Sequence, residues 1–104
     1  MSYNQDITTF IKTQLQATFG ARLKQVILFG SRARGDADED SDYDVLVLLE
    51  KRMNTDDEAL AEIWVSALID FNVVIGFFPT TETIFSSMPF EPVFVNVRRD
   101  GVLL

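Results

Sequence analysis

The sequence contains no cysteine and no histidine among its 104 residues. The absence of cysteine excludes disulfides, and nothing in the composition suggests secretion. Without these two residue types the chain cannot form a Cys/His zinc site, a Ser-His-Asp triad or a Cys-His dyad. Any metal must therefore be held by oxygen ligands, which favours Mg²⁺, Mn²⁺ or Ca²⁺.

Long apolar runs and an excess of positive charge are also missing. No run approaches the ~18 apolar residues that span a membrane, and the first residues lack the basic and apolar regions of a signal peptide. The formal net charge of −7 argues against a nucleic-acid footprint and fits a metal site, a basic protein partner or plain solubility. We therefore expect a cytoplasmic protein that contacts neither a membrane nor nucleic acid directly.

The length and the hydrophobic content suffice for one domain, residues 1–104, with a hydrophobic core. Hydrophobic residues make up 47% of the chain, and nine of them are phenylalanine. A chain of this size buries roughly two-thirds of its unfolded surface on folding. A partner subunit, in a homodimer or a hetero-oligomer, could usefully cover part of the rest.

Helix and strand patterns alternate along the chain. The spacing of apolar residues predicts a helix over Asn4–Phe19, which Gly20 would end. The residues Thr55–Glu58 have the pattern of a capping box and predict a second long helix that reaches about Leu68. Short, unbroken apolar runs predict three strands, at residues 23–29, 43–49 and 71–78.

Beyond the third strand the signals are shorter. Thr80–Glu82 can start a short helix. Residues 93–97 fit a helix face, yet their β-branched side chains favour a strand. Asp100-Gly101 predicts a turn, and Val102–Leu104 a short edge strand. With one helical turn after Ser31, the order α-β-α-β-α-β-α predicts an α/β fold in which helices pack against one sheet.

Two aspartates open the second predicted strand. Asp42 and Asp44 are two residues apart, so both carboxylates project from the same side of a strand. Two like charges this close require full solvation or a cation between them. An isolated Asp-X-Asp often belongs to a solvated acidic loop, but this pair leads directly into a buried strand. Tyr43 points to the opposite face and is expected to pack there.

The first strand ends in Gly30-Ser31. A glycine after a buried strand allows a close backbone approach, and the next residues can offer N–H groups to an anion. The Ser31 hydroxyl and the guanidinium groups of Arg32 and Arg34 are further donors suited to phosphate. Gly-Ser after a strand is also common in ordinary turns, and the two arginines could instead pair with the neighbouring acids.

Together these two elements resemble a known signature. The segment Phe29–Gly35 followed by Ser41–Asp44 resembles the motif of the DNA polymerase β-like nucleotidyltransferase superfamily, in which Gly-Ser precedes Asp-X-Asp by about ten residues. The ten residues between them here match the minimal nucleotidyltransferase (MNT) branch, whose members are stand-alone domains of about this length. The resemblance implies the nucleotidyltransferase fold, a small mixed β-sheet with helices packed against it.

The resemblance also implies an activity. Gly30 and Ser31, with Arg32 and Arg34, would bind phosphate, and Asp42 and Asp44 would hold two Mg²⁺ ions against the triphosphate of ATP or another nucleoside triphosphate. Two metals neutralise the charge that builds on the transferred phosphoryl group and align the attacking and leaving oxygens. Family members transfer a nucleoside monophosphate, commonly AMP, to a hydroxyl and release pyrophosphate.

The departure from the family pattern lies at the third strand. The family usually places a third carboxylate at the start of this strand, in a Val-Asp-hydrophobic-Val pattern. Aligning this pattern on residues 71–74 puts Asn72 at the position of the acid. An Asn can ligate a metal through its carbonyl, but it cannot act as a base. Asp70 is the alternative third ligand, although it also suits the role of a polar residue that closes a helix.

The resemblance finally implies a partner. Stand-alone MNT domains typically pair with HEPN-domain toxins in two-gene, type VII-like toxin–antitoxin systems, and the MNT protein can neutralise its partner by adenylylating a tyrosine. The alternative is a weak or inactive module that neutralises its partner by occlusion, and Asn72 motivates it. Trp64 and the phenylalanines are interpreted as core or interface residues, and Arg98-Arg99 as a solvated pair or a phosphate contact.

Overall fold

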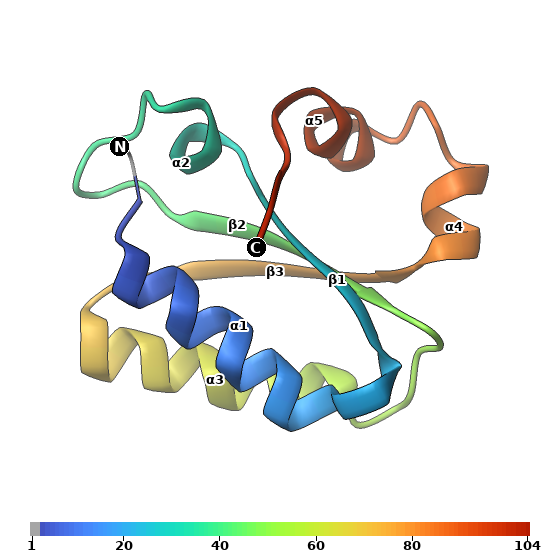
Figure 1. Ribbon diagram of the computed structural model, residues 1–104, viewed down its shortest axis with the longest axis horizontal. Coiled ribbons are helices and arrows are strands. Elements are labelled where there is room, and N and C mark those ends of the chain that lie inside the picture. Colours follow the sequence, from blue (N-terminus) through green and yellow to red (C-terminus); the bar gives the residue numbers. More distant parts are fainter. Residues whose placement is uncertain (1–2) are drawn as a thin grey trace.

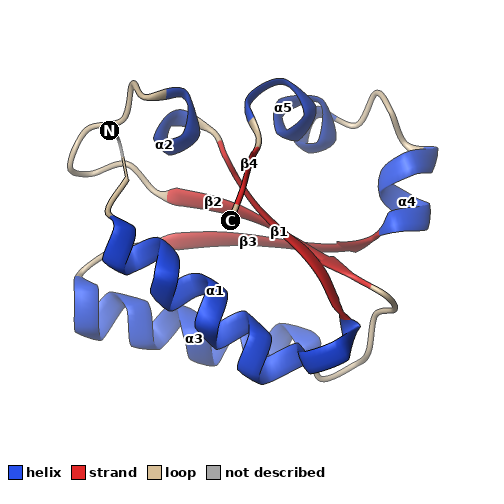
Figure 2. Cartoon of the chain, in the orientation of Figure 1, coloured by secondary structure: helices blue, strands red, loops and turns tan. Residues whose placement is uncertain are grey.

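The computed structural model describes residues 3–104 and has an α/β architecture (Figures 1 and 2). The strands are β1 (Leu23–Phe29), β2 (Tyr43–Leu49), β3 (Ile75–Thr81) and β4 (Val102–Leu103). The helices are α1 (Gln5–Phe19), the 3₁₀ turn η1 (Gly20–Arg22), α2 (Ser31–Arg34), α3 (Asp56–Phe71), α4 (Glu82–Ser87) and α5 (Pro92–Asp100). Within residues 3–104, none of these helices has the length and apolar character that a membrane crossing requires.

The four strands form one mixed sheet in the order β3-β2-β1-β4. β1 pairs antiparallel with both β2 and β4, while β2 and β3 pair in parallel. Parallel neighbours need a crossover connection, which α3 supplies between β2 and β3. The mixed sheet that the family resemblance implies is therefore confirmed.

Helices cover both faces of the sheet (Figure 1). α1 and α3 lie together on one face, where Tyr43, Val45 and Val47 of β2 join the larger core. On the opposite face Leu46 and Leu48 pack in a second core with Phe94 and Val97 of α5. Since successive side chains of a strand point to opposite faces, Asp44 lies on the same face as Leu46.

The first helix and the first two strands occur where their patterns predict them. The Asn4 side chain accepts a hydrogen bond from the Asp6 N–H at 2.7 Å and caps α1. At the other end, Gly20 adopts φ +55° and ends the helix. β1 and β2 have the predicted bounds because each apolar run stops sharply at polar or small residues.

The capping box predicted at Thr55 is wrong. Thr55 has αR backbone angles and its side chain makes no capping hydrogen bond. The buried Asp56 carboxylate instead accepts the Met53 N–H at 2.8 Å and ion-pairs with Arg22 at 2.8 Å and Arg52 at 3.3 Å. Asp56 therefore anchors the start of α3 to the entry of β1, which a local sequence pattern does not reveal.

The third strand starts later than predicted. α3 continues past Leu68 to Phe71, and β3 runs over Ile75–Thr81 rather than 71–78. Phe71 packs on Phe10 of α1, with ring centroids 5.0 Å apart, so this apolar residue belongs to a helix–helix contact. The continuous apolar run at 71–78 therefore spans the end of a helix as well as most of a strand.

Residues 93–97, for which the sequence fits either a helix or a strand, are part of the helix α5. The Glu91 carboxylate accepts the N–H groups of Val93 and Phe94 at 2.9 and 3.2 Å, and Pro92 occupies the first turn of α5. α4 follows Thr81, whose hydroxyl caps it through the Ile84 N–H. β4 forms the short edge strand that the sequence predicts.

Candidate active site

The predicted glycine turn and the two predicted aspartates meet at one end of the sheet. Because β1 is antiparallel to β2 and β2 is parallel to β3, the end of β1 lies beside the starts of β2 and β3. Phe29 of β1 pairs with Asp44 of β2, and Asp44 in turn pairs with Gly76 of β3. This cross-strand row places the turn that begins at Gly30 directly next to Asp44.

The Asp44 carboxylate lies between two glycines. A Cβ atom at position 30 would lie 2.5 Å from Asp44 Oδ2, and one at position 76 would lie 3.1 Å from Asp44 Oδ1. Gly30 also has φ +78°, a conformation that residues with side chains rarely adopt. The Asp44 carboxylate therefore occupies the space that a side chain would fill at position 30 or 76, and it lies close to the backbone of both glycines.

Asp42 and Asp44 interact electrostatically, but their environments differ. Asp42 is exposed just before β2, whereas Asp44 is half-buried. Burial raises the pKa of the Asp44 carboxyl, the charge of Asp42 raises this pKa further, and the positive charge of Arg34 lowers it. A half-buried carboxylate beside a second one favours the binding of a cation, which relieves both the repulsion and the desolvation.

Arg34 connects the turn to α5. Its Nη1 donates to Asp100 Oδ2 and its Nε to Asp36 Oδ2, each at 3.2 Å. The Asp100 side chain is 8% exposed and also pairs with Arg99. Hydrogen bonds to Asp36 and Asp100 raise the pKa of Arg34. Arg34 therefore pairs with acidic residues, which is one of the two roles that the sequence suggests for it. Its positive charge also lowers the pKa of Asp44.

Arg32 contacts the loop that precedes Asp42. Its Nε and Nη2 donate to the Ser41 carbonyl oxygen at 3.2 and 2.9 Å. Its guanidinium lies over the Tyr43 ring, 4.5 Å from the ring centroid. Tyr43 is buried on the α1 face, as predicted, and its hydroxyl accepts the Asn4 N–H at 3.1 Å. In this structure Arg32 fixes the loop against the start of β2.

Asn72 and Asp70 are not at the start of β3, so the alignment that suggested them is wrong. Asn72 ends α3 in a left-handed conformation, with φ +54°, and its N–H donates to the Leu68 carbonyl. Asp70 is an exposed residue of α3. Among residues 3–104, no group of three acidic, histidine or cysteine side chains that could hold a metal is present.

The position that faces Asp44 from β3 is Gly76. Sequence reasoning missed it because the apolar run predicted a strand that starts four residues too early, at Phe71 instead of Ile75. The usable signal was the lone glycine in an otherwise bulky strand, which often marks the close approach of another group. Asp100 was also missed, since nothing in the local sequence connects it to Arg34.

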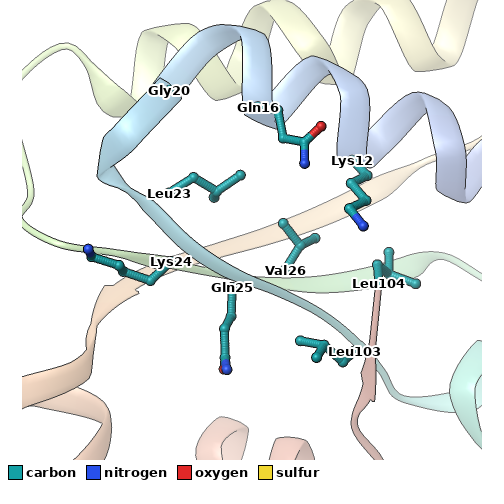
Figure 3. A pocket seen from close by; sticks show the side chains of 9 residues that line it. All are labelled: Lys12, Gln16, Gly20, Leu23, Lys24, Gln25, Val26, Leu103 and Leu104. Atoms are coloured by element: carbon teal, nitrogen blue, oxygen red, sulfur yellow. The ribbon is translucent and has the colours of Figure 1, made fainter.

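The donor set fits a hard divalent cation. Asp42 and Asp44 offer only carboxylate oxygens, which are the ligands that Mg²⁺ prefers. A pocket of about 380 Å³ lies elsewhere, against α1, β1 and the C-terminal residues; Lys12, Gln16, Lys24 and Leu104 are among its lining residues (Figure 3). That pocket contains neither aspartate, so the site at Asp44 is a separate feature of the surface.

The family follows from a comparison with known proteins. The sequence profile of the nucleotidyltransferase domain family matches residues 10–87. This match covers most of the chain, including both aspartates and the Gly-Ser turn. The protein belongs to the nucleotidyltransferase domain family, as its resemblance to the superfamily motif predicts.

Two curated relatives come from Methanocaldococcus jannaschii. One, described as a candidate protein adenylyltransferase, is 30% identical over 104 residues, which cover 100% of this chain and 99% of the relative. The other carries the same description and is 47% identical over 49 residues, which cover 47% of this chain and 41% of the relative.

Solved structures share the fold. A chain from a toxin–antitoxin crystal structure with AMP-PNP matches with a TM-score of 0.67 and 21% identity, over 91% of this chain and 69% of that chain. A chain from a complex of a tri-AMPylated Shewanella oneidensis HEPN toxin with an MNT antitoxin matches with a TM-score of 0.61 and 17% identity, over 99% of this chain and 71% of that chain. A candidate nucleotidyltransferase from Sulfolobus solfataricus matches with a TM-score of 0.52 and 22% identity, over 99% of this chain and 89% of that chain.

Proposed function

We propose that this protein is a Mg²⁺-dependent nucleotidyltransferase that transfers AMP from ATP to a hydroxyl group. The observation that carries the proposal is the Asp44 carboxylate, half-buried between Gly30 and Gly76 and electrostatically coupled to Asp42. In a member of the nucleotidyltransferase family, such a pair of carboxylates can hold the divalent cations that accompany a triphosphate.

In this proposal each residue has a distinct role. Asp42 and Asp44 hold two Mg²⁺ ions, which supply charge neutralisation on the transferred phosphoryl group. Gly30 lets Asp44 approach the turn, Ser31 offers its hydroxyl to phosphate, and Arg34 adds positive charge near Asp44. Arg32 keeps the following loop against β2, so that Asp42 stays near Asp44.

The transfer step forms one bond and breaks one bond. The acceptor oxygen attacks the α-phosphorus of ATP, the bond from that phosphorus to the α–β bridging oxygen breaks, and pyrophosphate leaves with the electron pair. The hydroxyl proton passes to solvent, because Gly76 offers no base at the β3 position that faces Asp44. An acidic acceptor hydroxyl, such as that of tyrosine (pKa about 10), suits a site of this kind.

We further propose that the acceptor is a tyrosine of a HEPN-domain toxin and that the protein is its cytoplasmic antitoxin. Two relatives support this proposal: a full-length match named as a candidate protein adenylyltransferase, and a fold neighbour from a complex described as a tri-AMPylated HEPN toxin with an MNT antitoxin. The net charge of −7 also suits a partner with a basic, RNA-binding surface.

A second candidate function is neutralisation by occlusion, without chemistry. Gly76 favours it, since β3 contributes no carboxylate to the site. Co-expression with the neighbouring gene product separates the two functions. The Asp44→Asn variant should fail to suppress toxicity while still co-purifying with the partner, and the Asp6→Asn variant, altered at an exposed acid of α1, should suppress it fully. Suppression by Asp44→Asn would support occlusion instead.

A further inference from the structure

α3 carries two apolar stripes, of which the core uses only one. Leu60, Ile63 and Ala67 are buried against the sheet and α1. A second stripe at helical spacing faces outward; its members are Ala61, Trp64, Val65, Leu68 and Ile69. Ile69 is 75% exposed and Val65 46% exposed. A helix that is apolar around most of its circumference is normally covered on both sides.

The outward stripe borders a groove. Trp64 and Val65, together with Phe77 and Pro79 of the edge strand β3, line a hollow of about 510 Å³. A smaller hollow of about 370 Å³ lies beyond Val65, against Glu58 and Glu62. Val65 and Ala61 line both hollows and form the ridge between them. The surface thus offers recesses on both sides of a ridge, into which the side chains of another element can fit.

Acidic residues of α3 line the two hollows. α3 contains no lysine or arginine; its exposed acids Asp57, Glu58 and Glu62 line the hollows, and Asp70 lies near the end of the helix. A second copy of the chain would bring these acids against each other, in addition to its own net charge of −7. A basic occupant would bring complementary charge to the same positions.

The edge strand beside the groove does not favour a further strand. Pro79 lies within β3 and has no N–H to donate, which blunts this edge against strand addition. The recesses instead follow α3, whose 16 residues span about 24 Å. A helix laid along this groove would match its length.

We propose that the α3 groove binds an amphipathic helix of a partner protein, with apolar anchors that fill the recesses and with lysine or arginine residues facing the acids. α3 covers the face of the sheet opposite to Asp44, so the groove and the candidate active site are separate. The inference therefore does not depend on the proposed chemistry, and a partner held here leaves the Asp44 face open to nucleotide.

Trp64 is the only tryptophan in the chain and reports directly on this groove. The probe is a 16-residue amphipathic helix of leucine and lysine; the controls are a scrambled peptide of the same composition and a leucine–glutamate analogue. We expect saturable binding of the basic helix, with a shift of Trp64 emission to shorter wavelength and reduced quenching by acrylamide. Neither control peptide should produce these changes.

Matched variants locate the binding. Val65→Lys places a charge on the ridge, and Val95→Lys makes the same change at a similarly exposed valine of α5. We expect Val65→Lys to weaken binding of the basic helix by at least about tenfold, the value of one lost 1.4 kcal/mol contact, and Val95→Lys to leave it unchanged. Circular dichroism should show that both variants fold, and both should bind ATP normally.

Three results would overturn the proposal. The first is an unchanged Trp64 emission with the basic helix. The second is equal binding of the scrambled peptide, which would mean attraction by charge alone. The third is a self-associated wild-type protein, measured by sedimentation, that Val65→Lys converts to a monomer; a second copy would then cover the groove. Loss of AMP transfer with intact peptide binding would count against the proposed enzymatic function only.

Discussion

Gly76 of β3 lies directly beside Asp44 of β2, and a Cβ atom at position 76 would lie 3.1 Å from Asp44 Oδ1. Any side chain at this position would enter the candidate metal site from the neighbouring strand. The glycine leaves Asp42 and Asp44 as the acidic residues of the site and leaves β3 without a base.

Gly76→Asp should add a third carboxylate to the site. We expect the variant to melt at a lower temperature than wild type in EDTA, because three like charges then repel at short range. Added Mg²⁺ should reverse this loss, with an apparent affinity about tenfold tighter than that of the wild type. Gly76→Asn is the matched control, since it adds similar bulk without charge. Equal Mg²⁺ responses of the two variants would contradict the placement of the site.

Gly30→Ala tests the role of the other glycine. The added Cβ would lie 2.5 Å from Asp44 Oδ2 at a backbone φ of +78°, so the carboxylate must move. We expect a loss of about 1–3 kcal/mol in the free energy of unfolding together with loss of Mg²⁺-dependent AMP transfer. Gly20→Ala is the control, because Gly20 also has positive φ but nothing lies within 4 Å of its added Cβ. It should lose stability and keep transfer; a loss of transfer in both variants would point to a general effect of destabilisation.

Asp100 should act as a positioning residue for Arg34. Asp100→Asn weakens the ion pair that holds the Arg34 guanidinium near Asp44. We expect KM for ATP to rise about tenfold, the value of one charge-assisted hydrogen bond of roughly 1.5 kcal/mol, while kcat changes less. Asp36→Asn removes the exposed partner of Arg34 and is the matched comparison. If its KM rises as much as that of Asp100→Asn, the anchoring role of α5 is wrong.

Asp56 should dominate the stability of the α3 start. Its carboxylate is 1% exposed and accepts hydrogen bonds from Arg22, Arg52 and Met53. Asp56→Ala leaves Arg22 without this partner, and we expect a loss of about 3–5 kcal/mol in urea unfolding. Asp57→Ala, at an exposed acid that pairs with Arg52, should cost less than about 1 kcal/mol. Similar losses in the two variants would contradict this ranking.

The same carboxylate gives a pH dependence. The hydrogen bond from Arg22, followed by that from the Met53 N–H, lowers the pKa of Asp56 in the folded state. Its stabilisation is therefore fully present above the ordinary aspartate pKa of about 3.9 and is lost as the pH falls through the lower folded value. The stability difference between wild type and Asp56→Asn should shrink in that acidic window and stay constant near neutral pH.

The sequence predicts the first half of the fold well because its signals there are local. α1, β1 and β2 are bounded by Gly20, Gly30 and Glu50, and their apolar patterns stop at these residues. The Gly-Ser and Asp-X-Asp pair lie at strand ends, so reading the strands correctly also brings the glycine turn and the aspartates together.

The parts that the sequence does not predict depend on tertiary contacts. Phe71 is a residue type that strands favour, but it packs on Phe10 in a helix–helix contact. β3 therefore starts later than predicted, and Gly76 rather than Asn72 lies beside Asp44. Arg34 and Asp100 are 66 positions apart, and only the docking of α5 makes them neighbours. Register and long-range ion pairs of this kind are not encoded in a local pattern.

The most direct test of the account is label transfer from α-labelled ATP. The protein is incubated with Mg²⁺ and the product of the neighbouring gene, as wild type, as Asp44→Asn and as the surface control Asp6→Asn. We predict label on a tyrosine of the partner with wild type and Asp6→Asn, and none with Asp44→Asn. A stable complex that acquires no label from any nucleoside triphosphate would contradict the proposed transfer and support a protein that neutralises its partner by occlusion.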